Sequence, residues 1–218
     1  MQNRTISVQE QVLWTTSLYT VRNPVHHEII APLKAYIYAY EASRDERVAS
    51  GVAANVKHGL FESTFDFFEA EDSAVDTLKQ FCGAAVMEVV RHVNASSWRR
   101  DGNFSLVFHD SWFHITRRGG YHDVHNHPNC SWCGIYYLDI GDSNQKNGSN
   151  TFYDPRNAAH SYTDYGTEYL DGKTRFDTAP KNGNLVIFPS YLYHAAPPYD
   201  GEGDRIVVAF NAGIHYDP

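Results

Sequence analysis

The stretch that most constrains the fold of this chain begins near residue 103, where the sequence becomes strand-like. From there, short runs of aromatic and β-branched residues alternate with clusters of Gly, Asn, Asp and Pro, a pattern typical of strands joined by turns. The candidate strands are 104–116, 132–140, 151–153, 185–189 and 205–211. Turns are expected at Arg118-Gly119-Gly120, Asn147-Gly148 and Lys181-Asn182-Gly183. So many short strands predict a closed or double-layered β-structure, because each strand must bury an apolar face.

Two helices are expected before these strands. Residues 25–42 and 73–94 carry apolar side chains at spacings of three and four, which is the period of a helix that packs on a core. Ser73 with Asp76 resembles a capping box at the start of the second helix. Helices followed by a run of strands predict the α+β class.

Composition excludes several classes of partner. The chain has 218 residues, which suits one domain, and its 26 acidic and 18 basic residues give a formal charge of −8. An acidic chain without a basic run is a poor ligand for nucleic acids and for anionic membrane surfaces. No apolar stretch reaches the roughly 20 residues of a membrane span. With only three cysteines and no visible signal peptide, we expect a cytoplasmic protein with free thiols.

A pair of histidines precedes one of the candidate strands. His125 and His127 are two residues apart, so in an extended chain they point to the same face, with Cα atoms roughly 6.6 Å apart. Two imidazoles at that spacing can bind one metal ion. The same pair is also typical of surface or capping histidines, so by itself it does not decide between the two.

Two further residues extend this pattern. The apolar run that ends at Pro189 is followed by a turn and then by His194, which such a turn can aim back into a sheet. Eleven residues later, Arg205 opens another apolar strand. A guanidinium offers a fork of donors that fits a carboxylate. Each feature alone is compatible with an ordinary packed histidine or a solvated arginine.

Taken together and in order, these motifs resemble the 2-oxoglutarate (2OG) dependent iron(II) oxygenases, and most closely a prolyl-hydroxylase-like group of 2OG-Fe(II) oxygenases. The matching segments cover roughly residues 100–213. They are His125-Asn-His127-Pro128, Cys133-Gly-Ile-Tyr-Tyr137, Asp154-Pro-Arg156, Phe188-Pro-Ser190 up to His194, and Arg205 up to Asn211.

The resemblance implies a fold and an architecture. The fold would be a double-stranded β-helix, or jelly roll, flanked by N-terminal helices. The whole chain, 1–218, would be one oxygenase domain with a helical flank at 1–100 and the β-helix core at 101–218.

The resemblance also implies roles for single residues. His125, His127 and His194 would bind Fe(II), and Arg205 would pair with the distal carboxylate of 2OG. Tyr137 would donate a hydrogen bond to the same carboxylate, and Asn211 would line the site. The candidates for contact with substrate are Arg156, Trp112 and His114.

The implied reaction consumes O2 and 2OG, releases succinate and CO2, and hydroxylates a C–H bond of a small molecule or of a peptide side chain. The specificity segments expected from position are 41–72 and the tyrosine-rich 154–182.

Several alternatives remain open from the residues. The usual carboxylate ligand is replaced here by His127, and Asp123 is a rival ligand. His125, His127, Cys130 and Cys133 could instead form a structural zinc site. A cupin-type metalloprotein that does not use 2OG is a rival function, although Tyr191 stands where its second motif commonly has Gly. The last alternative is a non-catalytic jelly-roll binding protein.

Overall fold

The structure is a computed structural model, and it describes residues 9–44, 57–98, 102–144, 146–156, 164–170 and 173–217. Two α-helices, α1 (His26–Ala42) and α2 (Ser73–Val93), and two short 3-10 helices, η1 (Phe67–Glu69) and η2 (Tyr165–Leu170), are present. The strands in chain order are β1 (Tyr19–Arg22), β2 (Lys57–Glu62), β3 (Asn103–His125), β4 (Trp132–Asp139), β5 (Thr151–Tyr153), β6 (Arg175–Asp177), β7 (Asn184–Pro189), β8 (His194–Ala196) and β9 (Arg205–Asp217).

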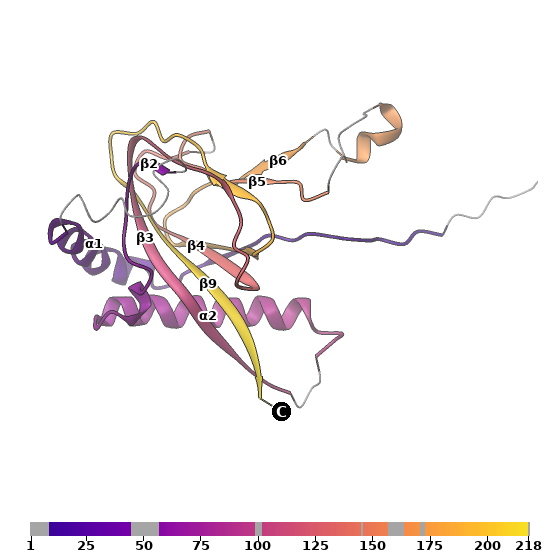
Figure 1. The fold of residues 1–218 in the computed structure, drawn as a ribbon, viewed down its shortest axis with the longest axis horizontal. Helices are drawn as coiled ribbons and strands as arrows, with labels where there is room; N and C mark the ends of the chain where they lie inside the picture. Colours follow the sequence, from indigo (N-terminus) through magenta and orange to yellow (C-terminus); the bar gives the residue numbers. More distant parts are fainter. Residues whose placement is uncertain are drawn as a thin grey trace, which may run out of the picture.

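The strands form one antiparallel sheet that curls around a cavity. The order is β1-β7-β4-β9-β3-β8-β5-β6, and β2 pairs with β3 beside this path. The long pair β3–β9 forms the middle of the sheet and crosses α2, whereas β5 and β6 lie away from α1 and α2 (Figure 1). The predicted α+β class is therefore confirmed, with its helices near the N-terminus and its strands mostly after residue 102.

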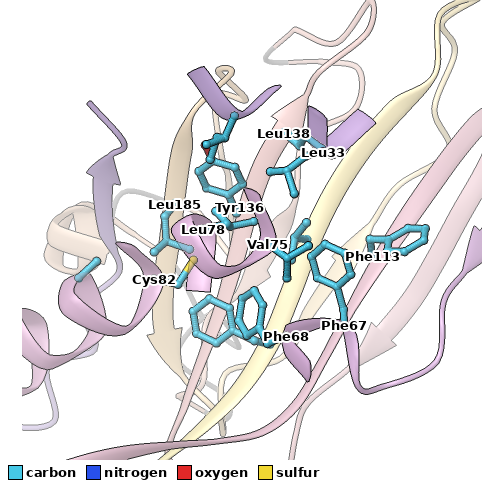
Figure 2. Close-up of a cluster of buried hydrophobic side chains, with 14 of the residues drawn as sticks. Leu33, Phe67, Phe68, Val75, Leu78, Cys82, Phe113, Tyr136, Leu138 and Leu185 are labelled. Atoms are coloured by element: carbon cyan, nitrogen blue, oxygen red, sulfur yellow. The ribbon is translucent and has the colours of Figure 1, made fainter. Parts of the chain in front are cut away.

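The helices cover one face of the sheet only. Their apolar stripes pack with inward-facing strand residues in one large cluster, part of which is shown in Figure 2. Tyr136 and Leu138 of β4 belong to this cluster, while Ile135 and Tyr137 belong to a second cluster on the opposite face. This alternation follows from the two-residue period of a strand. Neither α1 nor α2 contributes to the cluster on the second face, so that face is available for a site.

Three expectations differ from the structure. The segment 1–100 is not purely helical, because β1 pairs with β7 and β2 pairs with β3. The N-cap of α2 is Asp72, whose carboxylate accepts hydrogen bonds from the backbone N–H of Ala74 and Val75, so the Ser73–Asp76 capping box was wrong.

The expected turn at 118–120 also lies inside β3. Its partner strand shifts register between His58 and Leu60, and Gly59 and Gly119 both have positive φ values. Glycine tolerates such a backbone conformation, so the chain forms a bulge here and the strand continues instead of reversing.

Within the described residues, no helix is both long enough and apolar enough to cross a bilayer.

Alanine substitutions at two glycines should change the free energy of unfolding in opposite directions and so test this packing. A Cβ on Gly134 would lie 2.1 Å from the ring of the fully buried Phe210, whereas a Cβ on Gly83 in α2 would make an ordinary 3.7 Å contact with Phe108. We expect Gly134→Ala to lower the free energy of unfolding by about 1–3 kcal/mol through overpacking. Gly83→Ala should raise it by roughly 0.5–1 kcal/mol, because alanine favours a helix. Urea unfolding of both variants checks this, and equal stability of wild type and Gly134→Ala would contradict the described β4–β9 contact.

Candidate metal centre

Three histidines meet on the face of the sheet that carries no helix. His125 ends β3, His194 begins β8, and the two are direct partners in the antiparallel pairing of these strands. His127 lies two residues beyond His125, and its backbone N–H donates to the carbonyl of Ser190 over 3.1 Å, which ties it to the turn before His194. The nearest ring nitrogens of the three side chains all lie within 4.8 Å of one another. The fold thus brings together two segments that are far apart in the sequence.

Backbone carbonyls orient two of the three rings. Nδ1 of His125 donates to the carbonyl of Asp123 over 2.7 Å, and Nδ1 of His194 donates to the carbonyl of Leu192 over 3.1 Å. A ring that donates from Nδ1 keeps its lone pair on Nε2, the atom that then binds a metal. The site is in this respect arranged as a metal site would be.

The three imidazoles are also held neutral. Burial, reinforced by His125, lowers the pKa of His194 to about 3 and that of His127 to about 4. Burial lowers the pKa of His125 too. Only the neutral ring offers a lone pair, so protons compete weakly with a metal here.

The histidines line an open cavity that is also lined by Arg205. The guanidinium of Arg205 is 2% exposed. Its Nε donates to the carbonyl of Gly148 over 2.7 Å and its Nη2 to Oδ1 of Asn150 over 2.9 Å. No carboxylate pairs with it among the residues that the structure describes. A buried cation whose partners are all neutral is unfavourable, and a bound anion would relieve that cost.

The same region matches a known family. Residues 110–211 match the sequence model described as "Putative 2OG-Fe(II) oxygenase". This segment is therefore similar to the 2OG-Fe(II) oxygenases. Comparison with curated protein sequences gives no match.

Solved structures share the fold of this chain. A prolyl-4-hydroxylase from Pseudomonas putida matches with a TM-score of 0.56 and 16% identity, covering 90% of this chain and 93% of that one. The epimerase SnoN from nogalamycin biosynthesis matches with a TM-score of 0.60 and 13% identity, covering 93% and 81%. HygX from Streptomyces hygroscopicus was solved with nickel, 2-oxoglutarate and hygromycin B. It matches with a TM-score of 0.56 and 13% identity, covering 91% of this chain and 82% of that one. These matches identify the curled sheet as the jelly-roll core that the sequence predicted.

Three predicted site residues lie outside the cavity lining. The phenol of Tyr137 points to Asn150 and Thr178, 2.8 Å from the side-chain oxygen of each. Asn211 donates to the carboxylate of Asp110 over 3.1 Å, beside a register shift between β3 and β9. Arg156 is bound to its neighbour Asp154 and is about half exposed. The roles predicted for these residues are not supported by direct contact with the cavity.

The rival ligands stay apart from the three histidines. Asp123 is exposed, and it contributes its backbone carbonyl to His125 rather than its carboxylate. The thiols of Cys130 and Cys133 lie 3.6 Å from each other, and Cys133 contacts Asn211. Neither cysteine belongs to the group of convergent ligand atoms found in the described residues.

Two further histidines, His114 and His122, lie beside the centre. His122 stacks on His125 with ring centroids 3.9 Å apart. His114, predicted as a substrate contact, lines the cavity and bonds through Nε2 to Glu62 over 2.6 Å. Trp112, the other predicted contact, also lines the cavity and lies 5.8 Å from the ring of His127. Trp112 and His114 are two residues apart on β3, so strand alternation is the signal that places both on one face.

Among the described residues, the carboxylate that bonds to a histidine side chain of this group is that of Glu62, which contacts His114. Burial raises the pKa of Glu62, but hydrogen bonds and charge from His114 and Lys57 outweigh it and lower the pKa to about 2. At His114, burial dominates over Glu62 and lowers the pKa of the imidazole. Lys57, whose Nζ lies 2.5 Å from the carboxylate, is the second partner of Glu62 beside His114.

Substitution of one histidine tests the metal centre. We expect His194→Ala to weaken binding of Fe(II) or Zn²⁺ by more than about 100-fold, because loss of a ligand should exceed the cost of losing an outer hydrogen bond. The exposed His109 of β3 offers a matched control, and His109→Ala should bind metal like the wild type. Metal analysis after dialysis measures both, and full occupancy in His194→Ala would exclude this histidine as a ligand.

The Glu62 carboxylate predicts a pH dependence of stability. Its pKa is lower in the folded chain than in the unfolded one, so its stabilisation is present above pH about 4.5 and is lost as the pH falls toward about 2. The shift corresponds to at most about 3 kcal/mol. The stability difference between wild type and Glu62→Gln should therefore shrink through this window in urea titrations. Glu69→Gln, which removes an exposed partner of Lys79, should show little difference at any pH, and a constant Glu62→Gln difference would contradict the assignment.

Proposed function

We propose that this chain is an Fe(II)- and 2-oxoglutarate-dependent dioxygenase that hydroxylates a C–H bond of a small molecule or a peptide side chain. The observation that carries the proposal is the buried guanidinium of Arg205, which has no anionic partner among the described residues and faces the same cavity as three convergent imidazoles. A ligand with a metal-chelating end and a distal carboxylate fits both groups. We further propose that residues 1–218 form a single domain and act in the cytoplasm.

The residues of the centre fit a resident iron. Three neutral imidazoles can occupy one face of an octahedral ion and leave positions open for other ligands. When bound, iron supplies the activation of O2 that is coupled to decarboxylation of 2OG. Because His127 stands where related sites have a carboxylate, the protein contributes no negative charge to the metal. The centre is therefore one charge more positive than a centre with an Asp ligand, which favours an anionic co-substrate.

Arg205 has the task of holding and orienting the co-substrate. A guanidinium pairs with a carboxylate through two parallel N–H···O bonds, which fixes direction as well as position. Its Nε and Nη2 are already fixed by Gly148 and Asn150, so little side-chain entropy remains to be lost when the carboxylate binds. The keto-acid end of the co-substrate would then lie toward the three histidines.

The remaining cavity wall is proposed to contact the substrate. Leu60, Trp112, His114 and Tyr121 line it beside the histidines, so the wall is mainly aromatic with a few polar atoms. Solved structures with this fold include a prolyl-4-hydroxylase and the hygromycin B complex of HygX. Peptide and small-molecule substrates are therefore both consistent with this architecture. The predicted specificity segments 41–72 and 154–182 lie partly outside the described residues.

Formation of succinate tests the proposal. With Fe(II) and O2, the wild-type chain should convert 2OG to succinate, slowly without substrate and faster with one. Arg205→Gln should lower the rate at limiting 2OG by about 30-fold or more, because removal of a charged partner from a buried pair costs about 2–5 kcal/mol. Arg117→Gln is the matched control, since Arg117 is half exposed and pairs with Glu41 outside the cavity.

Two results would contradict the proposal. One is a wild-type chain that binds iron but neither binds 2OG nor releases succinate, as expected of a cupin-type metalloprotein. The other is an equal rate in wild type and Arg205→Gln at limiting 2OG.

A further inference from the structure

Next to Arg205, the cavity wall contains an asparagine that no sequence motif indicated. Asn150 precedes β5, is 6% exposed, and lines the same cavity as Arg205 and the three histidines. A buried amide has two donor hydrogens and an acceptor oxygen, and each needs a partner. The partners of Asn150 therefore show which of its atoms is left for a ligand.

The oxygen of this amide is already occupied. Oδ1 of Asn150 accepts from Nη2 of Arg205 over 2.9 Å and from the hydroxyl of Tyr137 over 2.8 Å. A guanidinium can only donate, so the group that faces it must be the oxygen and not the NH2. The orientation of the amide is thus fixed by chemistry, and Nδ2 occupies the other position.

The nitrogen has no such partner. Nδ2 of Asn150 forms no hydrogen bond with the residues that the structure describes. Nη1 of Arg205 has no close partner among them either, although the guanidinium also interacts with Tyr137, whose ring centroid lies 5.6 Å from Cζ of Arg205. Neither atom is among the fully enclosed polar atoms that lack a partner. Both residues line the cavity, so their remaining N–H groups are the donors that we expect a ligand there to use.

The backbone of Asn150 is held as firmly as its side chain. Its N–H donates to Oγ1 of Thr178 over 3.0 Å, and the N–H of Thr178 donates to its carbonyl over 2.9 Å. Oγ1 of Thr178 also contacts the hydroxyl of Tyr137. The amide is therefore preorganised, and a ligand that binds it would pay little in ordering entropy.

We propose that Asn150 is a second donor to the distal carboxylate of the co-substrate, beside Arg205. This inference rests on the proposed function. Nδ2 of Asn150 and the free N–H groups of Arg205 form one anion-binding corner of the cavity. Tyr137, which the sequence predicted as the donor, is instead a positioning residue that fixes Oδ1 of Asn150 from behind.

The corner selects the co-substrate by its tail. It recognises a 2-oxo acid that ends in a carboxylate, and it leaves donors unpaired when the tail is a methyl group. An unpaired buried donor is more costly than a missing contact, so such corners discriminate strongly. Comparing the affinities for 2OG and for 2-oxovalerate measures this selectivity. 2-Oxovalerate has the same chain length as 2OG but ends in a methyl group.

Calorimetric binding to the zinc-loaded chain tests the inference without turnover. Asn150→Ala should bind 2OG about 10- to 100-fold more weakly than the wild type, which is the effect of losing one hydrogen bond to a charged group. Its affinity for 2-oxovalerate should be unchanged. Tyr137→Phe should show a smaller loss for 2OG, because Nδ2 remains in place.

A matched control comes from the opposite face of β4. Asn23 is a buried asparagine that bonds to the hydroxyl of Tyr136, 3.1 Å away, among residues that do not line the cavity. Asn23→Ala should lower thermal stability without altering either affinity. Asn150→Asp keeps the acceptor for Arg205 and Tyr137 but replaces the donor with a negative charge, and it should bind 2OG most weakly of all.

Four outcomes are decisive. Wild-type affinity for 2OG in Asn150→Ala overturns the inference and leaves the proposed function standing. A larger loss in Tyr137→Phe than in Asn150→Ala returns the donor role to Tyr137. Equal losses for 2OG and 2-oxovalerate show general disruption and also overturn it. A wild type that does not bind 2OG removes the proposed function itself.

A structure of the zinc-loaded chain with 2OG separates donation from positioning. Nδ2 of Asn150 should lie about 2.7–3.2 Å from an oxygen of the distal carboxylate. A carboxylate bound by Arg205 alone, with Nδ2 turned away or out of range, would overturn the inference even if Asn150→Ala weakens binding.

Discussion

A guanidinium buried without an acid is the constraint on which the rest of the structure depends. Arg205 opens β9 at 2% exposure, and only neutral groups, a carbonyl and an amide, accept its hydrogen bonds among the described residues. Burying a charge in this way costs several kcal/mol, and a chain with a surplus of acidic residues could readily have supplied a partner. The cost is understandable if the partner is a ligand. The arginine then marks one end of a site built for an anion.

The metal centre is the other positive end of the same cavity. Cross-strand pairing of β3 and β8 sets His125 against His194, while pairing of β3 and β9 carries Arg205 on the neighbouring strand. β3 therefore organises both ends, and its bulge at Gly119 keeps it one continuous curved strand. Because all three ligands are neutral, a divalent ion and Arg205 together would present three positive charges to the cavity. A dicarboxylate that chelates the ion neutralises most of them, which explains why this site suits 2OG better than a neutral ligand.

The sequence predicted the histidines and the arginine that line the cavity better than the residues that support them. Both long helices, most of the strands and the three histidines follow from hydrophobic period and from motif order, because these are local signals. The strands β1, β2, β6 and β8 were missed, since they are three to six residues long and gain their stability from pairing with distant segments. Strand propensity in such short runs depends on context more than on sequence.

The supporting network was out of reach for a related reason. Tyr137 was expected at the co-substrate, but its hydroxyl is taken by Asn150 and Thr178, which come from loops 13 and 41 residues away. Likewise, Glu62 reaches His114 across 52 residues. No pattern along the chain indicates such contacts. They follow from how the sheet curls, and only coordinates show that Asn150, an unremarkable polar residue in sequence, lies beside the buried arginine.

The central claim is that the three imidazoles and the guanidinium act on one ligand, and thermodynamic coupling tests it most directly. The affinity for 2OG should be measured by calorimetry with and without a redox-inert divalent metal, and the affinity for the metal with and without 2OG. The account predicts that each ligand strengthens the other by the same factor, on the order of 5- to 150-fold. Independent affinities, with metal and 2OG each binding equally well in the absence of the other, would contradict it.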